Sequence, residues 1–221
     1  MEVNDSYKEF YGPVTKHMHA LVAERMVPLS VAGLMQDRIE VGRDVSKVNR
    51  HLMNNYYDTG DAIVYHPDGR IKIVLDSQLL RSITPKSELR DGALVVSDDN
   101  YAAAEGVEFK SGDLGRINSW LSPKEIKAHP VWQVLARDQA LLDEYTDYIL
   151  AEANESFGYD VVMGVFLESK GYEPQLRTVF IGGIANASFM GGGNDIDNRG
   201  GRLIGIKSRD QNVGDLVSTN H

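Results

Sequence analysis

Apolar residues at helical spacing dominate the first quarter of the chain. Residues 13–26 begin with Pro13, which suits a first helical turn, and their apolar side chains fall on one face. Pro28 interrupts that pattern, and a second helix is expected over 30–42, ended by a glycine. An aspartate cap and a further apolar stripe predict a third helix over 44–56. The pattern therefore predicts three consecutive helices.

The pattern then changes to that of strands. Two β-rich runs, 62–65 and 70–75, flank the turn sequence His66-Pro67-Asp68-Gly69, which predicts a hairpin. Further short apolar runs predict strands elsewhere in the chain, at 107–110, 161–167, 175–184 and 202–207. We expect these strands to form a mostly antiparallel sheet.

A long helix is predicted between these strands. Ser122-Pro123-Lys124-Glu125 matches a capping box with proline at the first helical position, and the periodic pattern continues to about residue 154, with a kink or a restart of the helix at Pro130. Asp138 falls inside its apolar stripe. A carboxyl group buried there would have a raised pKa and is a candidate acid or base, whereas a bend in the helix would bring Asp138 to solvent.

These elements indicate an α+β fold. The predicted organisation is a helical and hairpin region over 1–80, an α+β domain over 81–207 built on the long helix, and a polar, flexible tail over 208–221. A single domain over the same residues is the alternative, because no low-complexity linker marks the boundary near residue 80.

The composition excludes several kinds of functional site. The 221 residues carry a formal net charge of −9, are 42% hydrophobic and include no cysteine. Disulfides, thiolate metal sites and cysteine nucleophiles are therefore excluded. The N-terminal residues lack the pattern of a signal peptide, and no apolar run is suited to spanning a membrane. We expect a soluble cytoplasmic protein with no membrane partner.

Three helices followed by a hairpin is also the element order of a winged helix, in which the third helix enters the major groove of DNA. The hypothesis places six polar side chains at the nucleic acid: Arg43, Lys47, Arg50, Asn54, Arg70 and Lys72. The near balance of charge in this region gives it no strong basic footprint. The alternatives are a surface for a protein partner or an ordinary solvated face of a helical layer.

Residues 181–206 are rich in glycine and contain Asp195, Asp197 and Arg199. The spacing excludes an EF-hand, a phosphate-binding P-loop and a dinucleotide fingerprint, and the chain has no Gly-x-Ser-x-Gly motif. Two carboxylates on a turning backbone still make an irregular Mg²⁺ or small-ligand site a hypothesis. The alternative is a tight connection between strands.

Two functions follow from these patterns. One is a non-enzymatic binding protein that engages nucleic acid or a protein through the N-terminal helical region. The other is an enzyme or ligand-binding domain with its site in the glycine-rich segment. The sequence does not decide between them, and substrate, cofactor and oligomeric state stay open.

Overall fold

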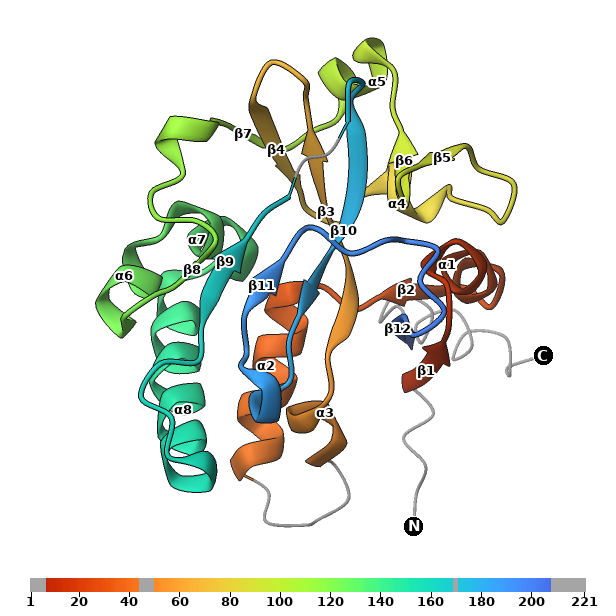
Figure 1. Cartoon of the computed structure of the whole chain (residues 1–221). Helices are drawn as coiled ribbons and strands as arrows, with labels where there is room; N and C mark the ends of the chain where they lie inside the picture. The colour runs from red at the N-terminus through yellow and green to blue at the C-terminus, as the bar shows by residue number, and fades with distance from the viewer. Residues whose placement is uncertain (1–6, 44–49, 169–170, 208–221) are drawn as a thin grey trace, which may run out of the picture.

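A computed structural model describes residues 7–43, 50–168 and 171–207 (Figure 1). Twelve strands among these residues form one sheet, and seven of them follow one another in the order β1-β12-β3-β10-β11-β9-β8. In that order the strands are Tyr7–Tyr11, Arg202–Lys207, Tyr57–Tyr65, Gln175–Ile181, Met190–Gly191, Gly164–Phe166 and Ser119–Trp120. The predicted α+β class is confirmed.

Five further strands extend this sheet. β2 pairs with β12, β4 pairs with β3 and β7, and β6 pairs with β5 and β10. Their bounds are Met26–Pro28 for β2, Arg70–Val74 for β4, Leu89–Arg90 for β5, Ala93–Val95 for β6 and Val107–Lys110 for β7. The sheet is mixed, because β11 runs parallel to β9 and β12 parallel to β3, whereas the other pairs are antiparallel.

Eight α-helices among the described residues surround the sheet. They are α1 Val14–Ala23, α2 Val31–Arg43, α3 Arg50–Asn54, α4 Gln78–Arg81, α5 Asp98–Ala103, α6 Pro123–Ala128, α7 Pro130–Ala136 and α8 Gln139–Phe157. Short 3-10 turns occur at Ser111–Asp113 and Ile184–Asn186. No helix in the described part of the chain is long and apolar enough to cross a membrane.

The main core lies on one face of the sheet. Helices α2, α7 and α8 pack together there (Figure 1), and their apolar side chains meet Val165, Val179, Ile181 and Met190 from β9, β10 and β11. A second core lies on the opposite face, where apolar side chains of α1 and α4 share one cluster with Ala62, Val64 and Leu176. The first half of β10 is therefore covered on both faces.

The predicted long helix is divided into three. The capping box at Ser122 is confirmed, with both of its hydrogen bonds formed. The helix ends at His129, restarts at Pro130, and stops again at Arg137, whose backbone is left-handed at φ 63°. Asp138 then caps α8. Local capping signals thus set these boundaries more strongly than the apolar periodicity did.

The winged-helix expectation is wrong. The predicted hairpin exists as β3 and β4, but β3 is a central strand that also pairs with β10 and β12. A wing lies at the edge of a small module, whereas this hairpin is part of the main sheet. Helices α1 and α2 contribute to cores on opposite faces, so they do not form a helical bundle beside it.

Strands from both predicted regions share this sheet. Strand β1 pairs with β12 along its whole length, from Tyr7↔Ile206 to Tyr11↔Arg202. Strand β3 pairs with β10 over most of its length. The boundary near residue 80 stays a prediction, and the tail predicted for 208–221 lies outside the described residues.

Candidate functional site

One face of the sheet carries aromatic side chains where the helices leave it uncovered. Successive side chains of a strand point to opposite faces, so Val165 and Met190 enter the core while their neighbours point the other way. Phe166 on β9, Phe180 on β10 and Phe189 beside β11 are all on that outer side, and none is fully buried. The outer face is therefore apolar yet open to solvent.

These rings form one continuous array together with two further residues, Trp120 and Tyr56. The Trp120 ring centroid lies 5.0 Å from that of Phe166 and 5.7 Å from that of Phe189. Phe189 lies 5.2 Å from Phe166 and 5.4 Å from Phe180, and Tyr56 lies 6.4 Å from Phe180. All five contacts are edge to face, the arrangement that aromatic quadrupoles favour. We call Tyr56, Trp120, Phe166, Phe180 and Phe189 the aromatic face.

Glycines allow the rings to lie close to the backbone. Gly191 stands between Phe166 and Phe180 in the strand register, and a Cβ there would collide with the Phe180 ring. A Cβ on Gly182 would meet the Phe189 ring at 3.1 Å and a carbonyl oxygen at still closer range. Part of the glycine-rich segment thus forms the floor beneath the aromatic face.

A hollow of about 460 Å³ opens beside these rings. It is lined by Asn118, Phe166, Leu167, Glu168, Phe180, Gly191, Gly193 and Asn194. The Asn118 side chain is held in place because its Oδ1 accepts a hydrogen bond from the Leu167 amide at 2.9 Å. An apolar floor with a few polar groups at the rim is the usual character of a binding site.

Arg177 fixes one edge of this hollow. Its fully buried guanidinium donates to the carbonyl oxygens of Gly193 and Asn194, at 3.2 and 3.0 Å, and to the carbonyl oxygen of Asp91. It also donates to the Asp195 carboxylate at 2.9 Å. The edge of the hollow is thus fastened to the central strand β10.

The residues predicted to bind a metal or small ligand have different surroundings. The Asp195 carboxylate is engaged by Arg177, whereas Asp197 and Arg199 are exposed in the turn that follows. That turn is closed by the amides of Asn198 and Gly201, which bond to carbonyl oxygens within it. No group of three or more histidine, aspartate or glutamate side chains suited to a metal occurs among the described residues. The Mg²⁺ hypothesis stays a prediction.

The residues predicted to contact nucleic acid do not gather on one surface. Arg43 forms an exposed ion pair with Glu144, and Asn54 is exposed at the end of α3. Arg50 begins α3, and Lys47 lies outside the described residues. The structure gives no evidence for nucleic-acid binding.

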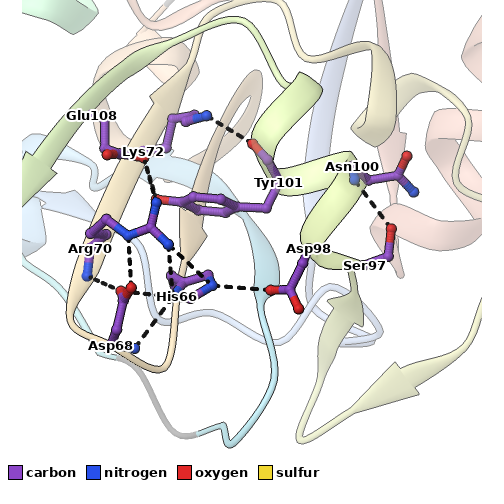
Figure 2. A network of polar contacts seen from close by, with 9 residues as sticks. All are labelled: His66, Asp68, Arg70, Lys72, Ser97, Asp98, Asn100, Tyr101 and Glu108. Atoms are coloured by element: carbon purple, nitrogen blue, oxygen red, sulfur yellow. Dashed lines mark hydrogen bonds and ion pairs between the residues drawn. The ribbon is translucent and has the colours of Figure 1, made fainter.

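Arg70 and Lys72 belong to a network that holds the β3–β4 hairpin to α5 (Figure 2). Desolvation opposes ionisation of Asp68, but hydrogen bonds from the Arg70 amide and guanidinium, the latter at 2.8 Å, together with His66 lower the pKa of that carboxyl to about 2. Lys72 is buried, and its ammonium donates to the carbonyl oxygens of Tyr101 and Ala104 at 2.8 and 3.2 Å. A lysine held in this way is a structural residue and does not reach a phosphate.

Asp138 is not a buried acid. It is exposed at the start of α8, and its Oδ1 accepts a hydrogen bond from the Leu141 amide at 2.8 Å. The carboxylate therefore satisfies a free N–H group of the first helical turn. Its position within an apolar stripe reflects the division of the predicted long helix.

The sequence interpretation missed two buried acids, Asp58 and Asp61. Burial raises the pKa of Asp58 to about 6, although the Arg202 amide donates to its Oδ2 at 3.0 Å. Burial also raises the pKa of Asp61. Hydrogen bonds from the Asp76 and Val31 amides and the positive charge of Arg137 act to lower this pKa but do not outweigh burial. The Asp61 carboxylate ties β3 to the start of α2.

The sequence does contain a signal for the aromatic face. Phe180 and Gly182, Phe189 and Gly191, and Gly164 and Phe166 are pairs of phenylalanine and glycine two residues apart. On a strand such pairs share one face, so a ring from one strand can lie over the glycine of its neighbour. The prediction considered glycine spacing for phosphate and calcium loops and did not consider this alternation.

No family model matches this chain, and no similar curated protein was found. A solved structure described as "Accommodation of massive sequence variation in Nanoarchaeota by the C-type lectin fold" is similar to it. The two are 18% identical, and the match covers 93% of this chain and 100% of the other with a TM-score of 0.68. This likeness shows that the chain has a C-type lectin fold.

Proposed function

We propose that the protein binds a partner protein through the aromatic face and performs no chemistry there. The observation that carries this proposal is the array of five solvent-accessible rings on the uncovered side of the sheet. Contiguous exposed apolar patches are rare on monomeric proteins and mark interaction sites. The proposed binding surface therefore lies on the sheet and not on the N-terminal helices.

The array is suited to tight binding because it is ordered before a partner arrives. Each ring contacts a neighbouring ring, and Phe180 and Phe189 lie over glycine backbone. Side chains that are already fixed lose little entropy on association. Tryptophan and tyrosine at the centre of an interface often contribute most of its binding energy. Trp120, with 42% of its surface exposed, has the most accessible ring of the array.

The hollow beside the rings favours binding over catalysis. Among the residues that the structure describes, its lining contains one ionisable side chain, Glu168, and no histidine, lysine or hydroxyl-bearing residue. General acid–base or nucleophilic catalysis normally requires at least two such groups in contact. One side chain of a partner can fill the hollow, while Asn118 and Asn194 offer hydrogen bonds at its rim.

The comparison supports this proposal at the level of the fold. The similar protein is described as accommodating massive sequence variation in a C-type lectin fold. We infer that the buried faces of this chain likewise hold the fold, whereas the outer face is free to be specialised. Under this proposal the aromatic face contributes to binding much more than to stability.

The experiment is a selection of phage-displayed random peptides, linear and cyclic, on the immobilised full-length protein. We expect enriched peptides to bind the wild type and to lose at least about tenfold in affinity for Trp120→Ala and Phe166→Ala. Phe157→Ala and Tyr172→Ala remove exposed aromatic rings that lie outside the array, and should leave the affinity unchanged.

Two results would overturn the proposal. One is a selection that enriches no peptide. The other is a set of enriched peptides that bind the aromatic-face variants and the wild type equally well while a control substitution abolishes binding. Circular dichroism of each variant shows whether a loss of binding comes from a loss of fold.

A further inference from the structure

A second cluster of functional side chains lies at the other end of the sheet, around Glu9. Tyr7, Glu9 and Tyr11 alternate along β1 and therefore share one face of that strand. The hydroxyl of Tyr7 donates to Glu9 Oε1 at 2.6 Å, that of Tyr57 does so at 3.2 Å, and that of Tyr11 donates to Oε2. His51 of α3 places its Nε2 2.7 Å from Glu9 Oε1.

Three of these atoms form a compact triangle. The Tyr7 hydroxyl and His51 Nε2 are 3.4 Å apart, and they lie 2.6 and 2.7 Å from Glu9 Oε1. Adjacent ligands of an octahedral ion with bonds of about 2.05 Å are about 2.9 Å apart. The three edges of 2.6, 2.7 and 3.4 Å have a mean close to this value, and the edge between Tyr7 and His51 is the longest. An ion bonded equally to all three atoms would lie about 1.1 Å above their plane, as in one face of an octahedron.

The donor types narrow the identity of the ion. The cluster offers phenol oxygens from Tyr7, Tyr11 and Tyr57, a carboxylate and one imidazole, with no sulfur. Hard oxygen donors favour hard cations, and an imidazole favours transition metals over Mg²⁺ and Ca²⁺. Tyrosine also serves as an axial ligand of haem iron in some proteins. We propose that this cluster is a ferric iron site, with Tyr7, Glu9 and His51 as one face of the coordination sphere.

The negative charges that the proposed ligands can supply match the charge of a trivalent ion. Binding releases the hydroxyl protons of the coordinating tyrosines to solvent, so that the Glu9 carboxylate and two tyrosinates balance the three positive charges.

The exposure of Glu9 and His51 is also suitable. His51 is 42% exposed, which gives an ion access from solvent to a carboxylate that is 11% exposed. The site is separate from the aromatic face and does not depend on the proposed function.

The test is a titration of the full-length protein with ferric nitrilotriacetate, followed by visible absorption and by thermal melting. We expect one equivalent of iron, a phenolate-to-iron charge-transfer band and a raised melting temperature. Tyr7→Phe removes a single hydroxyl and should weaken iron binding by at least about tenfold, as should His51→Ala. Tyr172→Phe alters a tyrosine that is 98% exposed elsewhere on the surface and should leave the band unchanged.

A protein that gives no charge-transfer band overturns the proposal. A band of equal intensity in Tyr7→Phe and His51→Ala also overturns it, because the iron is then bound elsewhere. Parallel titrations with Zn²⁺ and Cu²⁺ test the identity of the ion. A melting shift with either ion that is lost in His51→Ala, without a ferric band, overturns the assignment to iron. Glu9→Gln is a third variant, used if His51→Ala proves unstable.

Discussion

The guanidinium of Arg177 donates to the carboxylate of Asp195 at 2.9 Å, joining the central strand β10 to the glycine-rich segment. Arg177 is fully buried, whereas more than half of the Asp195 side chain is exposed. The same guanidinium holds the carbonyl oxygens of Gly193 and Asn194 at the edge of the hollow. The ion pair therefore fastens the candidate binding site to the core of the sheet.

Because Arg177 is buried and Asp195 is largely exposed, replacing the arginine should lower the free energy of unfolding more than replacing the aspartate. Arg177→Met leaves three carbonyl oxygens without their donor and should cost about 3 kcal/mol or more, because each acceptor left unsatisfied in a buried position costs about 1–3 kcal/mol. Asp195→Asn should cost about 1–2 kcal/mol, because an amide oxygen still accepts from Arg177. Urea unfolding measures both. An Asp195→Asn variant as unstable as Arg177→Met would contradict the structural role given to the arginine.

The chain has two tryptophans, which offer a matched comparison of stability. Trp132 is fully buried in the main core, whereas Trp120 is 42% exposed on the aromatic face. Trp132→Ala should cost about 3–5 kcal/mol, and Trp120→Ala no more than about 1.5 kcal/mol. Guanidinium unfolding of the two variants tests this. Equal losses of stability would show that the aromatic face is a part of the core.

Asp138 gives a prediction about helix capping. Asp138→Ala removes the acceptor for the Leu141 amide and should cost about 1 kcal/mol. Asp138→Asn should retain most of the stability, because asparagine caps helices equally well. Thermal melts of the two variants measure this difference in stability. If the two substitutions are equally destabilising, the negative charge of Asp138 matters more than its capping bond.

Asp58 predicts a dependence of stability on pH. Burial raises the pKa of Asp58 in the folded protein from its ordinary value of 3.8 to about 6, so the folded protein binds this proton more tightly than the unfolded chain does. The resulting stability is fully present below about pH 4 and is lost as the pH rises through about 6. Relative to Asp58→Asn, the wild type should lose about 1 kcal/mol between about pH 5 and pH 7.5. Urea unfolding at the two pH values measures this difference, and a constant difference would contradict the raised pKa.

Local signals predicted much of the secondary structure. The capping box at Ser122 and the hairpin turn at 66–69 depend on residues within four positions of one another, and both are present. The strands predicted at 161–167, 175–184 and 202–207 correspond to β9, β10 and β12. The α+β class followed from these elements.

The arrangement of the strands could not be predicted in the same way. Strand β3 pairs with β10, more than a hundred residues away, and nothing in the hairpin sequence indicates that partner. The order of three helices and a hairpin therefore suggested a winged helix, although the hairpin belongs to the main sheet. Long-range pairing also determines which face is left uncovered, so the alternation of phenylalanine and glycine could not by itself show that the aromatic face is open to solvent.

The central claim is that the aromatic face is the binding surface, and one ratio tests it most directly. The dissociation constant of a peptide selected on the wild type is compared between Trp120→Ala and Phe157→Ala, two variants that each lose an exposed ring of similar accessibility. The account predicts at least about a tenfold weaker complex for Trp120→Ala and an unchanged one for Phe157→Ala. Equal affinity for the two variants, both folded, would contradict it.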